Sequence, residues 1–306
     1  MSASDDALSD VLRMVRLRAC IYFIKNMAPG WGLDMPASAH GPLHMVLEGR
    51  AVLRVWGRDL VLEAGDAVLL PRGAPHEMRD TSAARVAPGL QAMQALSSEA
   101  GEGPRQGGAR MLCGHFEWDG TLDHPLFAEL PELIVVRDVF NRDGAALFRT
   151  VVDLITSEQT GEAPGARAVA DRMAEVLFVS LLRAWLAAHE PVQGVLATMR
   201  DSRLSRALCY MHAHHAEPVD LSRLSQEAGM SRTAFATRFH EVMGLPPASY
   251  LTEWRMLQAR RMLTRSERSI SEITDAVGYG SDAAFVRAFK RRFGQTPARL
   301  RRMGAA

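Results

Sequence analysis

A repeat close to the C-terminus constrains this chain of 306 residues more than any other feature. The segments 221–244 and 270–294 both have the pattern of a short helix, a tight turn and a second helix. An offset of 50 residues pairs Ser231 with Ser281, Phe235 with Phe285, Phe239 with Phe289, and Gly244 with Gly294. Self-similarity of this kind indicates two copies of one supersecondary unit. We therefore predict an all-α C-terminal domain over 200–306 that contains two helix-turn-helix units.

The residues that begin and end these helices fit that prediction. Four serines are expected N-caps, namely Ser222, Ser231, Ser269 and Ser281. Gly229 and Gly278 stand where the first helix of each copy has to end in a left-handed conformation. Because the phenylalanines recur at i and i+4, each second helix is predicted to bury one aromatic face and to leave the opposite face free.

The segment between the copies, 247–264, is predicted to form one long helix. At 1.5 Å per residue such a helix spans about 27 Å. A connector of this length can hold two recognition helices about one turn of DNA apart, which is roughly 34 Å.

The second copy carries the most specific signature in the chain. It consists of Ile273, Val277, Gly278, Tyr279, Ser281, Phe285, Arg287, Phe289, Lys290, Phe293, Gly294, Thr296 and Pro297. Together with the first copy, these residues make 204–302 resemble the AraC/XylS family of transcription regulators. Thr274 and Leu300 depart from the family pattern, but neither belongs to the surfaces that read DNA.

The resemblance implies that the second helix of each copy enters the major groove of double-stranded DNA. The implied base-facing residues are Thr233, Ala236, Thr237, Ala283, Val286 and Arg287. Arg232 and Arg291 are implied phosphate contacts. Arg287 is the strongest expected base reader, because a guanidinium group can bond bidentately to the O6 and N7 atoms of guanine.

The charge distribution agrees with a nucleic-acid partner for the C-terminal part. Residues 197–306 contain 18 Lys and Arg against 10 Asp and Glu, a net charge of +8. This leaves 18 of the 36 basic and 25 of the 35 acidic residues for 1–196, a net charge of −7. The asymmetry indicates one part of the chain that meets an anionic polymer and one that does not.

The N-terminal part is predicted to form a β-barrel. Six short segments separated by turn residues are candidate strands: 17–23, 43–47, 51–56, 59–62, 67–70 and 76–79. The run GDAVLLPRGAPH, from Gly65 to His76, has the spacing of the second cupin motif, and HMVLEG at 44–49 is similar to the end of the first. This resemblance covers about residues 8–190 and implies a cupin-like sensor over 1–140. The expected fold class is therefore α+β.

Four polar residues are candidates for an effector pocket in this barrel: His44, His76, Cys113 and His115. Metal-binding cupins usually have two His and one carboxylate in the first motif, but Pro42 and residues 36–38 stand at those positions. An organic effector is therefore the first interpretation. The alternative is a divalent metal such as zinc or nickel, held by His44, His76 and Cys113. His40, in a turn rich in Gly and Pro, is expected at the surface.

The cysteines suggest a third kind of sensing. Cys20, Cys113 and Cys209 are the three cysteines of the chain, which is typical of a reducing cytoplasm and not of a disulfide framework. Cys20 and Cys113 lie in the sensor part on separate expected strands, so they are candidate redox-active thiols. Buried structural cysteine is the alternative interpretation.

Two amphipathic helices are predicted after the barrel, at 144–159 and 166–189. Their apolar stripes suggest a homodimer interface, although the same stripes could pack on the barrel of their own chain. We predict a helical dimerisation segment and linker over 141–195, with the break in pattern at 190–201.

The function that these features predict is a cytoplasmic transcription regulator and not an enzyme. Its expected partners are double-stranded DNA, RNA polymerase, a small-molecule effector and a second copy of the chain. No apolar run reaches the roughly 18 residues of a membrane span. The alternatives are a cupin-type metalloenzyme with an appended DNA-binding module, a metal- or redox-sensing regulator, and an architectural DNA-binding protein.

Overall fold

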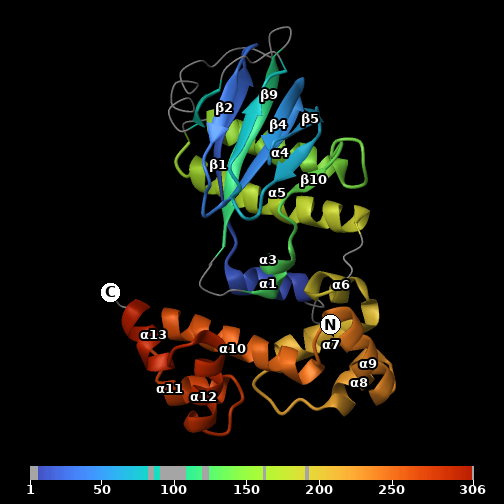
Figure 1. Ribbon diagram of the computed structural model, residues 1–306, viewed down its shortest axis with the longest axis vertical. Coiled ribbons are helices and arrows are strands. Elements are labelled where there is room, and N and C mark those ends of the chain that lie inside the picture. Colours follow the sequence, from blue (N-terminus) through green and yellow to red (C-terminus); the bar gives the residue numbers. More distant parts are fainter. Residues whose placement is uncertain are drawn as a thin grey trace. The chain divides into compact units, whose positions relative to one another are not determined.

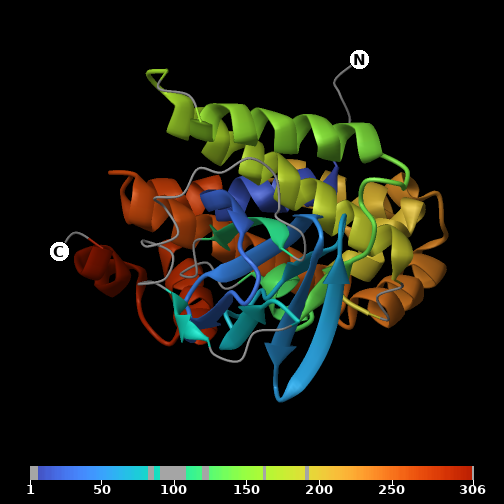
Figure 2. The ribbon, with the colours of Figure 1, turned by 90° about the horizontal axis from the view of Figure 1, so that it is seen from above.

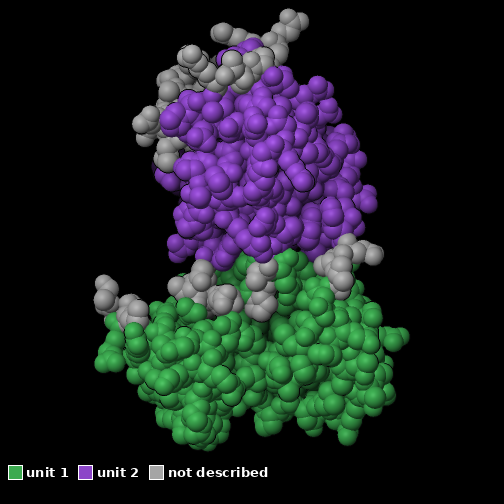
Figure 3. Space-filling model, in the orientation of Figure 1, with its two compact units in different colours: residues 1–16, 119–129, 190–306 green, residues 17–118, 130–189 purple. Residues whose placement is uncertain are grey.

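The computed structural model describes residues 6–81, 86–89, 108–118, 124–160, 163–189 and 193–304. They fall into two compact units, shown in two colours in Figure 3. The β unit comprises 17–118 and 130–189, and the helical unit comprises 1–16, 119–129 and 190–306. The predicted α+β class is confirmed. Our boundaries at 140 and 195 stay predictions, since the units are built from discontinuous segments and the predicted domains from continuous ones.

The described residues of the β unit form two sheets of five strands each (Figure 1). The first has the order β1 (Arg18–Met27), β9 (Ala109–Glu117), β3 (Gly41–Glu48), β6 (Ala67–Leu69) and β10 (Ile134–Val136). The second has the order β5 (Arg58–Glu63), β4 (Arg50–Val55), β7 (His76–Arg79), β2 (Gly32–Met35) and β8 (Ala87–Pro88). All paired strands are antiparallel except β2 and β8.

Apolar side chains from both sheets pack together and form the core of the β unit. Phe23, Val46 and Met111 come from the first sheet and meet Leu53 and Met78 of the second. Alternation along each strand sends these residues to one side, which is the physical reason for the period-two pattern in the sequence. All six strands predicted from that pattern are present. The short strands β2, β8 and β10 were missed because two to four residues carry little pattern.

Two long helices in the described part of this unit accompany its sheets: α4 (Ala145–Thr160) and α5 (Ala166–Ala188). They match the predicted helices and lie against each other (Figure 2). On α4, Phe148, Val151 and Ile155 are buried. Phe178 of α5 packs on Phe116 of β9 with ring centroids 4.5 Å apart. Both helices therefore bury one face within their own unit.

The helical unit contains the two predicted helix-turn-helix copies. They are formed by α8 (Leu221–Ala228) with α9 (Arg232–Met243), and by α11 (Ile270–Ala276) with α12 (Asp282–Phe293). The predicted connector is α10 (Pro247–Arg265), and the remaining helices are α1 (Ala7–Val15), α3 (Pro125–Glu129), α6 (Val195–Arg200), α7 (Ser202–Ala213) and α13 (Pro297–Gly304). Helix α6 lies within the stretch that we expected to be linker. None of the described helices has the length and apolar character of a membrane span.

Three of the four predicted serine caps are correct. The Ser231 and Ser281 side chains accept hydrogen bonds from Ala234 N and Ala284 N, and Ser269 forms a capping box with Glu272. Ser222 is not a cap.

The N-cap of α8 is instead Asp220, whose carboxylate accepts a hydrogen bond from Arg223 N. Both residue types are good caps, so composition alone does not choose between two candidates that are two positions apart. The turn glycines are as predicted, with φ of +64° at Gly229 and +75° at Gly278.

A buried histidine connects the N-terminal helix to other helices of the helical unit. His212 Nδ1 lies 3.1 Å from an Asp10 carboxylate oxygen of α1, and His212 Nε2 lies 2.7 Å from the Tyr250 hydroxyl of α10. The imidazole also stacks on Trp254, with ring centroids 3.6 Å apart. One side chain thus joins α1, α7 and α10, which are far apart in the sequence.

We predict that His212→Phe lowers the free energy of unfolding by about 1–3 kcal/mol, because it keeps the ring but leaves the buried Tyr250 hydroxyl without its partner. Urea unfolding of the full chain measures the change. The double variant His212→Phe/Tyr250→Phe should recover part of the loss, since no hydroxyl then stays unsatisfied. Equal stability of His212→Phe and the parent would contradict this role.

Candidate nucleic-acid interface and barrel side-chain clusters

Three of the four predicted pocket residues meet inside the β unit. His44 and Cys113 are opposite each other on β3 and β9, and the Cys113 Sγ atom lies 3.1 Å from His44 Nδ1. On its other side, His44 Nε2 lies 2.8 Å from Nε2 of His76, which belongs to the second sheet. The three side chains therefore form a continuous polar chain across an otherwise apolar core.

A backbone carbonyl fixes the direction of the hydrogen bonds in this chain. His76 Nδ1 lies 2.8 Å from the Ala74 carbonyl oxygen, which can only accept, so Nδ1 carries the proton. In a neutral ring His76 Nε2 then accepts, and His44 Nε2–H donates to it. His44 Nδ1 is left to accept from the Cys113 thiol. Every polar atom in the chain has a partner.

Burial keeps all three groups neutral. It lowers the pKa of His44 well below the usual value, with a further contribution from neighbouring His76. Burial also lowers the pKa of His76, while it raises that of the Cys113 thiol. The three groups therefore form a chain of neutral donors and acceptors, in which Cys113 is the thiol and not the thiolate.

The predicted metal-ligand set of His44, His76 and Cys113 does not offer three donors to one ion. His44 lies between the other two, and it faces them with opposite nitrogens of one ring. A single ion could not replace both hydrogen bonds. Among the described residues, these three are accordingly not a group whose donor atoms converge.

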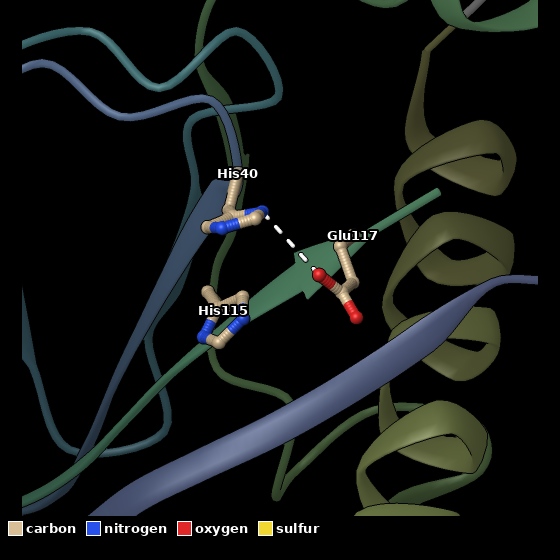
Figure 4. Close-up of side chains that lie close together, drawn as sticks. All are labelled: His40, His115 and Glu117. Atoms are coloured by element: carbon tan, nitrogen blue, oxygen red, sulfur yellow. Dashed lines mark ion pairs between the residues drawn. The ribbon is translucent and has the colours of Figure 1, made fainter. Parts of the chain in front are cut away.

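His115, the fourth predicted residue, lies with other partners. It forms a group with His40 and Glu117 in which one ligand atom from each residue is within 4.8 Å of the others (Figure 4). His40 Nδ1 is 3.6 Å from a Glu117 carboxylate oxygen, and the His40 and His115 ring centroids are 4.7 Å apart. All three residues are half-buried. The prediction that His115 converges with His44 and His76 is therefore wrong.

The backbone places this second group. His115 and Glu117 are two positions apart on β9, so both point to the same face of the strand. His40 precedes β3 in a turn that packs closely on Gly73, where an added Cβ would lie 2.7 Å from the His40 carbonyl oxygen. Gly73 also has φ +63°, which favours glycine. The glycine of the second cupin-like motif thus positions the turn that carries His40.

Sequence reasoning missed two members of this group. Glu117 has the signal that identified His115, a spacing of two on one strand, but a lone carboxylate near a strand end is common. The surface assignment of His40 was based on its turn. It is wrong in part, because the turn folds back beside β9 and half-buries the ring. Burial and the nearby His40 lower the pKa of His115, against the opposite effect of Glu117 and Asp171.

The proposed redox pair is not brought into contact by strand pairing. Cys20 is opposite His115 on β1 and β9, whereas Cys113 is opposite Phe23. The Cys20 sulfur lies 3.9 Å from the Arg167 guanidinium of α5, and Cys113 faces His44. All three cysteines are free thiols.

Each of the two recognition helices has one buried face and one exposed face, as reading DNA requires. The rings of Phe235, Phe239, Phe285 and Phe289 are fully buried. The residues on the other faces of α9 and α12 are exposed at Arg232, Thr233, Thr237, Ala283, Arg287 and Arg291 and half-buried at Ala236 and Val286. No predicted DNA-contact residue is lost to the core. The last turn of α12 is also basic, with Lys290, Arg291 and Arg292.

Arg232 has an additional contact within the first copy. Its guanidinium donates two hydrogen bonds to the Ser222 hydroxyl, at 3.1 and 2.7 Å. The serine that we expected to cap α8 therefore holds the side chain at the start of α9. An arginine oriented in this way remains exposed and can present its other N–H groups outward.

Comparison with known proteins agrees with this division. Residues 6–187 match a family described as cupin, and 224–303 match a helix-turn-helix domain. The chain is 26% identical over 302 residues to the HTH-type transcriptional regulator AlkR of Acinetobacter baylyi, covering 97% of this chain and 99% of that protein. It is also 26% identical over 302 residues to the RCS-specific HTH-type transcriptional activator RclR of Escherichia coli (strain K12), covering 97% of each.

A solved structure of an AraC-type DNA-binding regulator from Chromobacterium violaceum is 28% identical and covers 35% of this chain and 95% of that one, with a TM-score of 0.33. The cupin match spans more than half of the chain, and the full-length relatives are regulators and not enzymes. The chain therefore belongs to the AraC-family helix-turn-helix transcription regulators with an N-terminal cupin domain.

Proposed function

We propose that this regulator is a cytoplasmic homodimer that binds double-stranded DNA through α9 and α12 and passes the state of its cupin domain to RNA polymerase. One observation carries the proposal. Both recognition helices bury a pair of phenylalanines and expose a polar and basic face on the opposite side. Such a helix can enter a major groove without losing its own packing.

The exposed residues divide into base readers and phosphate contacts. We assign base contacts to Thr233, Ala236 and Thr237 on α9, and to Ala283, Val286 and Arg287 on α12. Arg232 and Arg291 are assigned to phosphates. Alanine and valine offer apolar contacts alone, so thymine methyl groups and DNA shape supply part of the specificity.

Arg287→Ala should weaken binding to the cognate site by about 1–3 kcal/mol and relax the preference for guanine at one position. Fluorescence anisotropy with the parent and a set of single-base variants of the site measures both effects. Arg299→Ala, which removes an exposed arginine of α13, is the matched control and should leave base preference unchanged. Parent-like affinity and base preference in Arg287→Ala at physiological salt would rule out the assignment.

Arg291→Ala and Arg232→Ala should weaken specific and non-specific binding alike. Each should lower the magnitude of the salt slope by about one unit, because one phosphate fewer is neutralised. A salt titration of both variants on cognate and random DNA gives the slopes. Unchanged slopes would show that these side chains do not contact phosphates.

The effector proposal follows the chemistry of the core. A small organic molecule is the first candidate, because the neutral chain of His44, His76 and Cys113 is surrounded by apolar residues such as Phe23 and Leu53. Binding sites for such ligands combine apolar walls with a few orienting polar groups. A divalent metal such as zinc or nickel is the second candidate, favoured by His40, His115 and Glu117. Oxidation of Cys20 or Cys113 is the third.

The dimer proposal rests on apolar residues that α4 and α5 leave exposed. Four of the eight large apolar side chains that the described residues expose lie on these two helices. They are Leu147, Leu154, Val169 and Val176, which are 37–43% exposed. On each helix the pair is seven residues apart and so lies along one face. A second copy of the chain is the partner that covers such a face symmetrically.

Leu154→Lys should shift the chain from dimer to monomer, because it places a charge within the apolar face. Sedimentation velocity at micromolar concentration without DNA measures the state. Val61→Lys is the matched control, since Val61 is an equally exposed apolar residue on β5. A monomeric parent would contradict the proposal. So would a Leu154→Lys chain that remains a dimer while the Val61→Lys chain becomes a monomer.

A further inference from the structure

We infer that His40, His115 and Glu117 form a binding site for one divalent first-row transition-metal ion of the zinc and nickel class. The site is distinct from the polar chain of His44, His76 and Cys113. For its regulatory meaning the inference rests on the proposed function, whereas ion binding itself can be tested without DNA.

The donor atoms are already close to the required geometry. One ligand atom of each residue lies within 4.8 Å of the other two, and His40 Nδ1 is 3.6 Å from a Glu117 oxygen. Zinc bonds to nitrogen and carboxylate oxygen are about 2.0–2.2 Å long, which separates tetrahedral donors by about 3.3–3.5 Å. Small side-chain rotations bring three such donors onto one ion.

The chemistry of the donors selects the class of ion. Two imidazoles and one carboxylate suit zinc, nickel, copper and ferrous iron better than magnesium or calcium, which prefer oxygen donors alone. Three protein donors also leave at least one coordination position open to water or to a small anionic ligand.

An unsatisfied atom supports the site independently of this geometry. His115 Nδ1 is buried and has no hydrogen-bond partner among the described residues. Buried polar atoms without a partner are rare in folded proteins and call for an explanation. A bound ion, or the reorientation of the ring by one, supplies the missing interaction.

The site also stands on a rigid framework. His115 and Glu117 lie on β9, which pairs with β1 on one side and β3 on the other. His40 is fixed by the close approach of its turn to Gly73. Besides His40, Glu117 has an ion-pair partner in the described part of the chain in Arg18, at 4.0 Å. A long, exposed ion pair of this kind is worth little and is readily replaced.

The test is calorimetric titration of the metal-free, untagged full chain with Zn²⁺. We expect one ion per chain. His40→Ala, His115→Ala and Glu117→Gln should each weaken binding at least tenfold. His214→Ala is the matched control, because His214 forms a similar half-exposed pair with Glu217 at 3.1 Å on the helical unit, and it should bind like the parent. Thermal unfolding of each variant without metal confirms that it is folded.

Co²⁺ provides a second readout that separates the two barrel clusters. A tetrahedral site of two imidazoles and a carboxylate gives visible d–d bands without the intense sulfur-to-cobalt charge-transfer band. These bands should be present in the parent and in Cys113→Ala, and absent from His115→Ala and Glu117→Gln. A sulfur band that disappears in Cys113→Ala would overturn the inference in favour of the other cluster.

Two further results would also overturn it: no binding of Zn²⁺ by the folded parent, or binding that none of the three variants weakens. Neither result contradicts the proposed function if the metal-free parent still binds DNA. Conversely, parent-like DNA binding by Arg287→Ala would rule out the assigned base contact and would leave zinc binding by the parent unaffected, so the two proposals can fail separately.

Discussion

Burial of four phenylalanine rings is the packing constraint on which the DNA-binding surface depends. Full burial of one such side chain contributes about 1.5–3 kcal/mol, and each recognition helix buries two. Because the rings lie at i and i+4, they fix the rotation of α9 and α12 about their own axes. The residues that must face DNA are then exposed by default, and α10 connects the two helices within one unit.

A comparable constraint acts in the cupin domain through the alternation of side chains along β9. Cys113 joins the polar chain that ends on the Ala74 carbonyl, while His115 and Glu117, further along the same face, meet His40. The chain runs directly from β9 and from β1 into segments that belong to the helical unit, 119–129 and 1–16. These strand ends are therefore continuous in sequence with segments of the helical unit.

Much of this could be predicted from local pattern, because strand alternation, the Phe spacing and serine capping are properties of neighbouring residues. The failures concern long-range placement. His44, His76 and Cys113 do meet, but pairing across two sheets puts His44 between the others, so their donor atoms do not share one centre, and His115 lies with other partners. The group of His40 and Glu117 depends on a turn that folds beside β9. The hydrogen bond between His212 and Asp10 joins residues 202 positions apart. The spacing of residue types along the sequence does not predict such contacts.

The most direct test of the account is selection from a random DNA library by the purified full chain, followed by sequencing of the bound DNA. Two recognition helices on one rigid connector should enrich a motif with two separate blocks, whose centres lie about 10–10.5 base pairs apart. The Arg287→Ala chain should lose one guanine from one block and keep the other block intact. Enrichment of a single block, or of two blocks at variable spacing, would contradict the account.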